Sequence, residues 1–388
     1  MSDQAVTAHG MRRFLGRQRE LKALRADIER AGLDTIAGRK APRARVLLIA
    51  GRPGSGRTAL AEELAAGLSG AYPDGILRTR LTEFDGAPVP TERTARELLD
   101  ALGIAGPAGA DGDELAETLR EALAVRRTVV LLDDCVDAEQ VDPLLPDNPE
   151  CLVVAVAQGP LTGIPDVRPC TLGGLDPKSA IELLETFTGS VRITVDPQAA
   201  ETLTEVCGGK PAALVLAGRW LAAHPKSSVA DLAKRMRAQT GEPQDRAFRL
   251  LYESLPRAAA RILRLLALAP LGLADAHTAS ALAGCSVSAA ATTLSDFAAL
   301  GLVRAADDDQ YEVPGHLAAP LRAIMEEEDR PAEMQLARAR MLERTVRLLQ
   351  SCRAVTEPEG SPARRKLAGL PRALRFPSAA AGADWLRG

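Results

Sequence analysis

The sequence predicts an α/β domain with a parallel sheet, followed by a helical domain, a winged-helix domain and a C-terminal helical tail. Three observations lead to this fold class. Short apolar runs alternate with helical patterns over residues 46–172, which is typical of a parallel sheet covered on both faces. A glycine-rich segment joins the first apolar run directly to a helix. Further along, strand patterns fade, and several helices precede a β-hairpin.

The first domain begins with a surface helix, because Leu21, Leu24 and Ile28 recur at helical spacing. A linker rich in Pro and Arg (39–45) leads into the first apolar run. The predicted strands are Val46–Ala50, Ile76–Leu81, Thr128–Leu132 and Cys151–Ala157, and helical patterns cover Ala59–Leu68, Leu98–Leu102 and Leu115–Leu123.

The later elements divide the rest of the chain. Residues 177–238 carry helical patterns alone, and residues 246–300 carry further helices before the hairpin formed by 301–305 and 310–313, with a turn at 307–309. That order predicts a winged helix. The predicted domains are 1–45 (helix and linker), 46–172 (nucleotide-binding), 173–242 (helical), 243–325 (winged helix) and 326–388 (helical tail).

Composition narrows the possible functions. The 388 residues are 46% hydrophobic with a net charge of −3, which excludes a mainly disordered chain and argues against a dominant nucleic-acid surface. Six cysteines without CxxC spacing predict neither a disulfide framework nor a zinc site. The N-terminus has no apolar signal segment, and no apolar run is long enough to cross a membrane, so we expect a cytoplasmic protein. The chain holds 41 Arg but only 7 Lys.

The segment Gly51–Thr58 has the spacing of the P-loop motif, GxxxxGK[ST], between a strand and a helix. Glycines let successive N–H groups converge on a phosphate, and the helix N-terminus adds partial positive charge. The alternative is a plain glycine turn. We therefore expect a P-loop NTPase domain that binds ADP or ATP, with Mg²⁺ accompanying ATP. The expected nucleotide-binding residues here are Gly51, Arg52, Pro53, Gly54, Ser55, Gly56, Arg57, Thr58 and Ala59.

Arg57 stands where the motif has its phosphate-bridging lysine. Arginine stays charged and can hold phosphate bidentately, but its planar fork is bulkier than an ammonium group. Binding can survive this exchange while positioning of the γ-phosphate for transfer suffers. We therefore expect weak or absent hydrolysis.

The apolar run ending in Asp133 and Asp134 supplies acids beside the P-loop. We expect Thr58 and, through water, Asp133 to hold Mg²⁺, and Asp134 to be the candidate that orients an attacking water. The next strand is followed by Gln158, so a charged phosphate sensor is missing there. Cys135 is interpreted as a buried thiol, because neighbouring carboxylates raise a thiol pKa.

Several segments resemble one known family. Residues 14–21 (FLGRQREL) look like the "FxGRxxEL" segment of STAND NTPases, and residues 72–75, 144–146 and 208–214 (GGKPAAL) look like landmarks of the NB-ARC module. The chain is most similar to actinobacterial regulators of antibiotic production, over about residues 12–325. The resemblance implies that Arg17 and Pro211 border the nucleotide.

The resemblance also implies a switch that ADP keeps closed and ATP opens, often with oligomerisation. The family's "HD" motif, whose histidine contacts the β-phosphate of ADP, is altered in residues 313–317. Either His316 has taken that role after a shift of register, or the role is lost. Without the resemblance, His316 is interpreted as a surface or helix-capping residue. Residues 376–386 resemble only the approach to a TPR array, so the array is either absent or cut off from a longer protein.

We therefore predict a nucleotide-binding signalling switch that regulates a downstream process such as transcription or secondary metabolism, with a protein partner or self-association on activation. The alternatives are an active ATPase motor, disfavoured by Arg57 and Gln158, and a nucleotide-free scaffold or DNA-binding regulator. The third helix of the winged helix, 286–300, has no Lys or Arg, so we expect no direct DNA binding by it. The acidic run 326–329 is expected to be a solvated helix end.

Overall fold

The computed structural model describes residues 14–36, 44–306, 309–369 and 374–387. The chain divides into two compact units, Met1–Ser254 and Leu255–Gly388, and each is described by itself. The predictions for residues 1–13, most of the 39–45 linker and the start of the 307–309 turn lie outside the described residues. The domain boundaries proposed from the sequence stay predictions.

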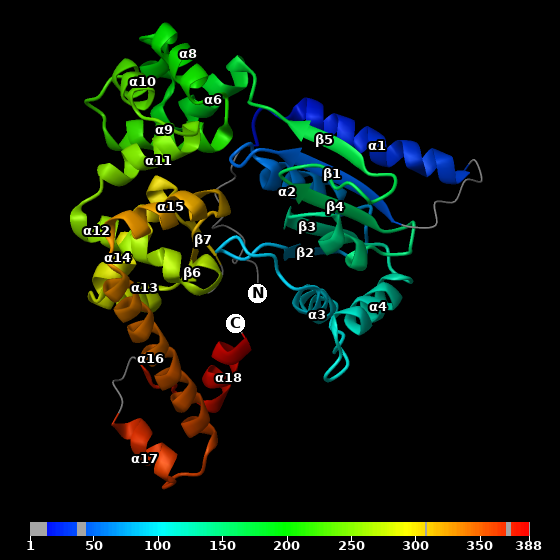
Figure 1. Cartoon of the computed structure of the whole chain (residues 1–388), viewed down its shortest axis with the longest axis vertical. Coiled ribbons are helices and arrows are strands. Elements are labelled where there is room, and N and C mark those ends of the chain that lie inside the picture. Colours follow the sequence, from blue (N-terminus) through cyan, green and yellow to red (C-terminus); the bar gives the residue numbers. More distant parts are fainter. Residues whose placement is uncertain (1–13, 37–43, 307–308, 370–373, 388) are drawn as a thin grey trace, which may run out of the picture. The chain divides into compact units, whose positions relative to one another are not determined.

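The first unit contains a five-stranded parallel sheet in the order β2-β3-β4-β1-β5 (Figure 1). This confirms the predicted α/β fold class. The sequence did not predict β5, because this edge strand is largely exposed and contains Pro169. The strands are β1 Arg45–Gly51, β2 Ile76–Arg80, β3 Val129–Cys135, β4 Leu152–Ala157 and β5 Arg168–Leu172.

Alternating side chains of the strands build two apolar layers. Leu47 and Ile49 of β1 pack into a core with the first two helices, whereas Val46 and Leu48 pack into a second core on the other face. The helices of this part are α1 Gln18–Ile36, α2 Arg57–Leu68, α3 Thr91–Ala101, α4 Gly112–Leu123 and α5 Ala138–Val141, with the short 3₁₀ helix η1 Asp142–Leu144. Both faces of the sheet are thus covered, which leaves its carboxyl edge to form a site.

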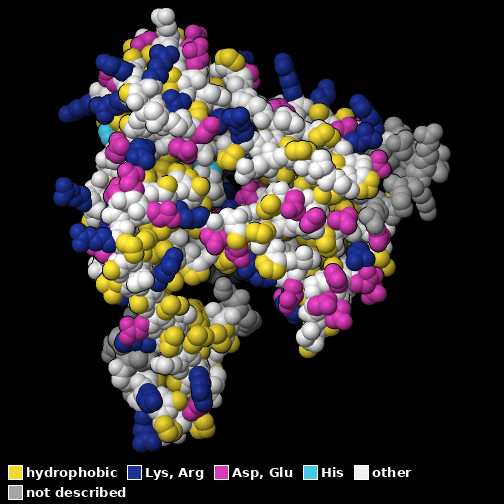
Figure 2. Space-filling view, in the orientation of Figure 1, with side chains coloured by type: hydrophobic (Ala, Val, Ile, Leu, Met, Phe, Trp, Pro, Cys, Tyr) yellow, Lys and Arg dark blue, Asp and Glu magenta, His cyan; other side chains and the backbone are white. Residues whose placement is uncertain are grey.

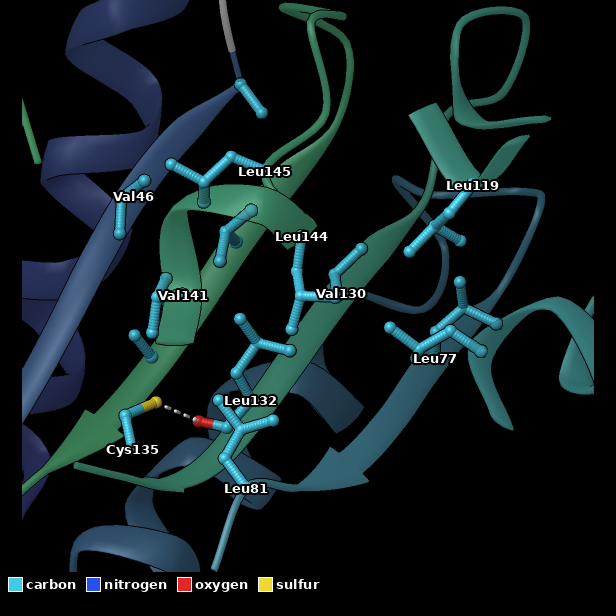
Figure 3. Close-up of a cluster of buried hydrophobic side chains, with 14 of the residues drawn as sticks. Val46, Leu77, Leu81, Leu119, Val130, Leu132, Cys135, Val141, Leu144 and Leu145 are labelled. Atoms are coloured by element: carbon cyan, nitrogen blue, oxygen red, sulfur yellow. Dashed lines mark hydrogen bonds between the residues drawn. The ribbon is translucent and has the colours of Figure 1, made fainter. Parts of the chain in front are cut away.

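Cys135 lies in the second of these cores (Figure 3). Its thiol is buried and donates a hydrogen bond to the carbonyl of Leu132, with Sγ and O 3.3 Å apart. Burial, with a smaller effect from Asp133, raises the pKa of this thiol to about 12. The interpretation of Cys135 as a buried thiol is confirmed.

A bundle of helices completes the first unit. The main-chain N–H of Leu175 donates to the carbonyl of Gly209 over 2.7 Å, and Gly208 and Gly209 both have positive φ. This left-handed pair turns the chain sharply, so that a helix begins at Pro211. The helices are α6 Pro177–Thr188, α7 Ser190–Thr194, α8 Pro197–Val206, α9 Pro211–Ala223, α10 Val229–Ala238 and α11 Pro243–Glu253.

The second unit starts with helices and a small antiparallel sheet in the order β6-β8-β7. Helices followed by a hairpin are the order that the sequence predicts, and the winged-helix assignment stays a prediction. The elements are α12 Arg257–Leu265, η2 Leu266–Leu268, η3 Pro270–Gly272, β6 Leu273–Ala274, α13 Ala276–Ala283, α14 Val287–Leu300, β7 Arg304–Ala305, β8 Tyr311–Glu312 and α15 Gly315–Glu328.

The expectation of a solvated acidic helix end is wrong for the last residue of the run. Asp329 is buried, and its carboxylate accepts from Nε and Nη2 of Arg264 at 2.7 and 3.0 Å. Arg264 also pairs with Glu328 at 2.7 Å, so a cation 65 residues upstream in the sequence compensates the acids. Sequence patterns cannot reveal such a distant partner.

The tail consists of α16 Pro331–Thr356, α17 Pro362–Ala368 and α18 Ala379–Arg387. Figure 2 shows hydrophobic side chains on the surface of this part of the molecule. Those that are large and exposed are Leu336, Leu342, Val346, Leu349, Trp385 and Leu386. In the described part of the chain, the helices are too short or too polar to traverse a lipid bilayer.

Candidate functional site: the loop between β1 and α2

The predicted P-loop lies at the carboxyl end of β1, which ends at Gly51, and leads into α2, which begins at Arg57. Gly54 and Gly56 have φ angles of +79° and +87°, which side-chain-bearing residues rarely adopt. A Cβ on Gly51 would lie 2.8 Å from Oγ of Ser55 and 3.1 Å from the carbonyl oxygen of Leu172. The loop therefore needs its glycines for both conformation and space.

Two polar atoms of this loop are buried without a hydrogen-bond partner: Oγ of Ser55 and Nη1 of Arg57. Buried donors normally find acceptors, because an unmet donor costs about 1–3 kcal/mol. Main-chain N–H groups at the N-terminus of α2 add partial positive charge in the same place. The residues present therefore fit an anionic ligand such as a phosphate group.

Arg17 is 4% exposed, and its side chain bonds to the main chain of the loop. Its Nη2 donates to the carbonyls of Ser55 and Gly173 at 3.1 and 2.6 Å, and its Nη1 donates to Glu20 at 2.7 Å. The structure thus brings Arg17 to the P-loop through the loop's main chain. That Arg17 also borders a nucleotide stays a prediction.

Thr58 and Asp133 lie next to each other. The Thr58 hydroxyl donates to both carboxylate oxygens of Asp133, over 3.0 and 3.1 Å. Burial, with a smaller contribution from the charge of Asp134, raises the pKa of the Asp133 carboxyl to about 6, and the hydrogen bond from Thr58 opposes the shift. The Thr58 hydroxyl and the Asp133 carboxylate, whose charged form is disfavoured here, are oxygen ligands suited to a hard divalent cation.

The carboxylate of Asp134 pairs with two arginines. Its Oδ1 accepts from Nη2 of Arg57 at 3.2 Å, and its Oδ2 accepts from Nη2 of Arg80 at 3.0 Å. The sequence analysis missed Arg80, the last residue of β2. The signal that could have identified Arg80 is its position, because it is a cationic residue at the carboxyl end of β2, the strand next to β3.

The helical part of the first unit also meets the loop. The main-chain N–H of Ala212 donates to the carbonyl of Gly54 over 3.1 Å, and Cγ of Pro211 lies 3.5 Å from the position of a Cβ on Gly56. Pro211 therefore adjoins the P-loop, as the predicted role requires. The buried side chain of Gln244 on α11 also reaches the loop, since its Oε1 lies 2.0 Å from a Cβ placed on Gly54. Nothing in the sequence marked Gln244.

The remaining predicted residues are placed as follows. The side chain of Arg52 is largely exposed, 3.7 Å from Glu242. Pro53 lies in the loop, and Ala59 is the third residue of α2. Gln158 directly follows β4. His316 lies in the first turn of α15, in the second unit, so its predicted contact with a nucleotide stays a prediction.

Comparison with known proteins places this fold and site in context. No family model matches the chain. The crystal structure of a STAND protein (signal transduction ATPase with numerous domains) with a tetratricopeptide repeat sensor, from Pyrococcus horikoshii, superposes with a TM-score of 0.55 at 17% identity, covering 92% of this chain and 52% of that one. The chain therefore has a fold similar to that of this STAND protein.

In sequence, the chain resembles two curated regulators. It is 29% identical to the regulatory protein AfsR of Streptomyces coelicolor, over 96% of this chain and 39% of that protein. It is 28% identical to AfsR of Streptomyces griseus, over 88% of this chain and 36% of that protein. The chain thus resembles AfsR-type regulators and spans less than two fifths of their length.

Proposed function

We propose that this chain is the nucleotide-binding switch of a regulatory protein, and that it binds ADP or ATP at Gly51–Thr58. The P-loop geometry carries the proposal: glycines with positive φ, a helix N-terminus, and two buried polar atoms without partners on Ser55 and Arg57. Similarity to regulators named AfsR and the STAND-type fold support the regulatory role.

In this proposal the nucleotide phosphates are held by main-chain N–H groups of the loop and by Arg57. With ATP, a Mg²⁺ ion would supply positive charge to the phosphates. Thr58 and Asp133 are the residues that would hold the cation, directly and through water. Pro211, whose Cγ lies 3.5 Å from the position of a Cβ on Gly56, would border the nucleotide from α9.

We propose weak or absent hydrolysis. Asp134, the candidate for orienting a water, is already paired with Arg57 and Arg80. Arg57 replaces the usual lysine, and neutral Gln158 follows the strand where a sensing charge was expected. An active ATPase would need these groups to be redistributed.

Residues 243–325, most of which lie in the second unit, are proposed to form an NB-ARC-type winged helix that reads the nucleotide state, with His316 as its sensor. Helix α14 carries no Lys or Arg, so we retain the prediction that it does not bind DNA directly, although the comparisons give that prediction no support. Self-association or a protein partner on activation, and a cytoplasmic location, also remain predictions.

The decisive experiment is to denature the purified protein and identify any nucleotide that it releases. Bound ADP would support the switch. No nucleotide, together with no binding of ADP or ATP in a titration, would refute it and favour a nucleotide-free scaffold.

A matched pair of variants tests the site itself. Thr58→Val is expected to remove the Mg²⁺-dependent part of ATP binding, because the hydroxyl beside Asp133 is lost. Thr118→Val is the control, since that hydroxyl only bonds the carbonyl of Glu114 in its own helix. Equal effects of both variants on ATP binding would contradict the assignment.

A further inference from the structure

The carboxylate of Asp134 is shared by two guanidinium groups that approach it from different elements. Arg57 is the first residue of α2, and Arg80 is the last residue of β2. The side chain of Arg57 is 8% exposed, while those of Arg80 and Asp134 are 30% and 25% exposed. Water therefore screens the Arg57–Asp134 ion pair only in part, so the attraction between the two charges remains significant.

The main chain of Asp134 is held in one conformation. Its φ angle is +52°, its N–H donates to Oδ1 of Asp133 over 3.0 Å, and its carbonyl accepts from the hydroxyl of Thr82 at 2.5 Å. The pairing of β3 with β4 is irregular between Leu132 and Cys135. The carboxylate is thus presented from a fixed bulge, and the longer arginine side chains are the parts that can change partner.

Arg57 has more hydrogen-bonding capacity than it uses. Its Nη2 reaches Asp134 at 3.2 Å, whereas its buried Nη1 has no partner. A guanidinium fork binds carboxylates and phosphates with the same planar, bidentate geometry. A phosphate that used both Nη atoms of Arg57 would therefore have to replace Asp134 at Nη2.

We propose that Asp134 competes with nucleotide phosphate for Arg57, and that Arg80 weakens this competition by pairing with the same carboxylate. The inference rests on the proposed function, because it concerns affinity at that site. Nucleotide binding then exchanges the Arg57–Asp134 pair for an Arg57–phosphate pair, and Asp134 keeps Arg80 as its remaining cation.

This arrangement predicts effects of opposite sign for two residues of one ion-pair cluster. Asp134→Asn frees Arg57, so ADP affinity is expected to rise by about three- to tenfold, within the range of one charge-assisted hydrogen bond. Asparagine also tolerates the positive φ at this position. Arg80→Gln leaves Asp134 to Arg57 alone, and ADP affinity is expected to fall by about two- to fivefold.

The experiment is a calorimetric titration of ADP in EDTA, which removes any contribution from Mg²⁺, using wild type and both variants. Glu92→Gln is the control, because it makes the same change of charge in an exposed pair with Arg96 on α3. The gain from Asp134→Asn should vanish when Arg57 is also replaced by Met. A thermal melt without nucleotide gives a second readout: Asp134→Asn should lower the melting temperature, since Arg57 loses its charged partner.

A merely structural role for Asp134 would lower stability and affinity together. The proposal is overturned if wild type binds ADP and Asp134→Asn binds it no more tightly, or if the gain persists without Arg57. Absence of ADP binding in every form of the protein would instead refute the proposed function.

Discussion

Replacing Arg17 by alanine should destabilise the first unit even without any ligand. The guanidinium is buried and bonds the carbonyls of Ser55 and Gly173 at 3.1 and 2.6 Å. Its removal leaves the buried carbonyl of Ser55 short of a donor, and an unmet buried acceptor costs about 1–3 kcal/mol, whereas water can replace the donor at exposed Gly173. We therefore expect a loss of about 1–3 kcal/mol in the free energy of unfolding.

Urea denaturation followed by tryptophan fluorescence measures this loss. The chain has two tryptophans, Trp220 in the first unit and Trp385 in the second, so the assay uses a Trp385→Phe background that reports on the first unit alone. Arg19→Ala is the control, because Arg19 lies two residues further along the chain, is exposed on α1, and should change stability by less than about 0.5 kcal/mol when replaced. If Arg17→Ala and Arg19→Ala shift the midpoint equally, Arg17 does not anchor the loop.

Three further predictions concern other positions. Asp133→Asn should stabilise the metal-free protein by up to about 3 kcal/mol at pH 8 and by little below pH 4. The reason is that the pKa of Asp133 is about 6 in the folded protein and 3.8 in the unfolded chain, so that ionisation of the carboxyl destabilises the folded state only at the higher pH. Urea titrations in EDTA at both pH values test this, and equal effects would contradict it. Gly54→Ala should cost more stability than Gly86→Ala, since both have positive φ but only Gly54 has side chains within 4 Å of a Cβ, and equal melting temperatures would refute the crowding. Arg264→Ala should destabilise the second unit by about 3 kcal/mol or more, because it leaves a buried carboxylate unpaired. The control Arg347→Ala breaks an exposed ion pair within a helix and should cost about 0.5 kcal/mol or less. Thermal melting measures both, and similar costs would show that burial does not strengthen the Arg264 ion pair.

Much of the first unit could be predicted from local patterns. Fully apolar runs such as Val46–Ala50 and Cys151–Ala157 became central strands, because only a strand buried on both faces has that composition. The glycine spacing of the loop, and the placement of Thr58 near Asp133, followed from the P-loop motif and the acids after the third run. These features depend on residues close in sequence, or on the common carboxyl edge of a parallel sheet.

What could not be predicted depends on distant partners. The edge strand Arg168–Leu172 has a mostly exposed pattern that resembles a loop, and its strand identity comes only from pairing with β1. The contacts of Arg80 and Gln244 with the site require knowledge of which side chains fold back over the P-loop. Asp134 was expected to face a water molecule, whereas the structure gives its carboxylate two cationic partners.

The bond between the N–H of Ala212 and the carbonyl of Gly54 has a consequence for how sequences of this kind can diverge. Because both atoms belong to the main chain, any residue except proline at position 212 can make this bond. Substitutions can therefore accumulate around it without separating the helical bundle from the loop. Distant relatives can preserve this connection even where their side chains have few identities in common, and no alignment of residue types would record it.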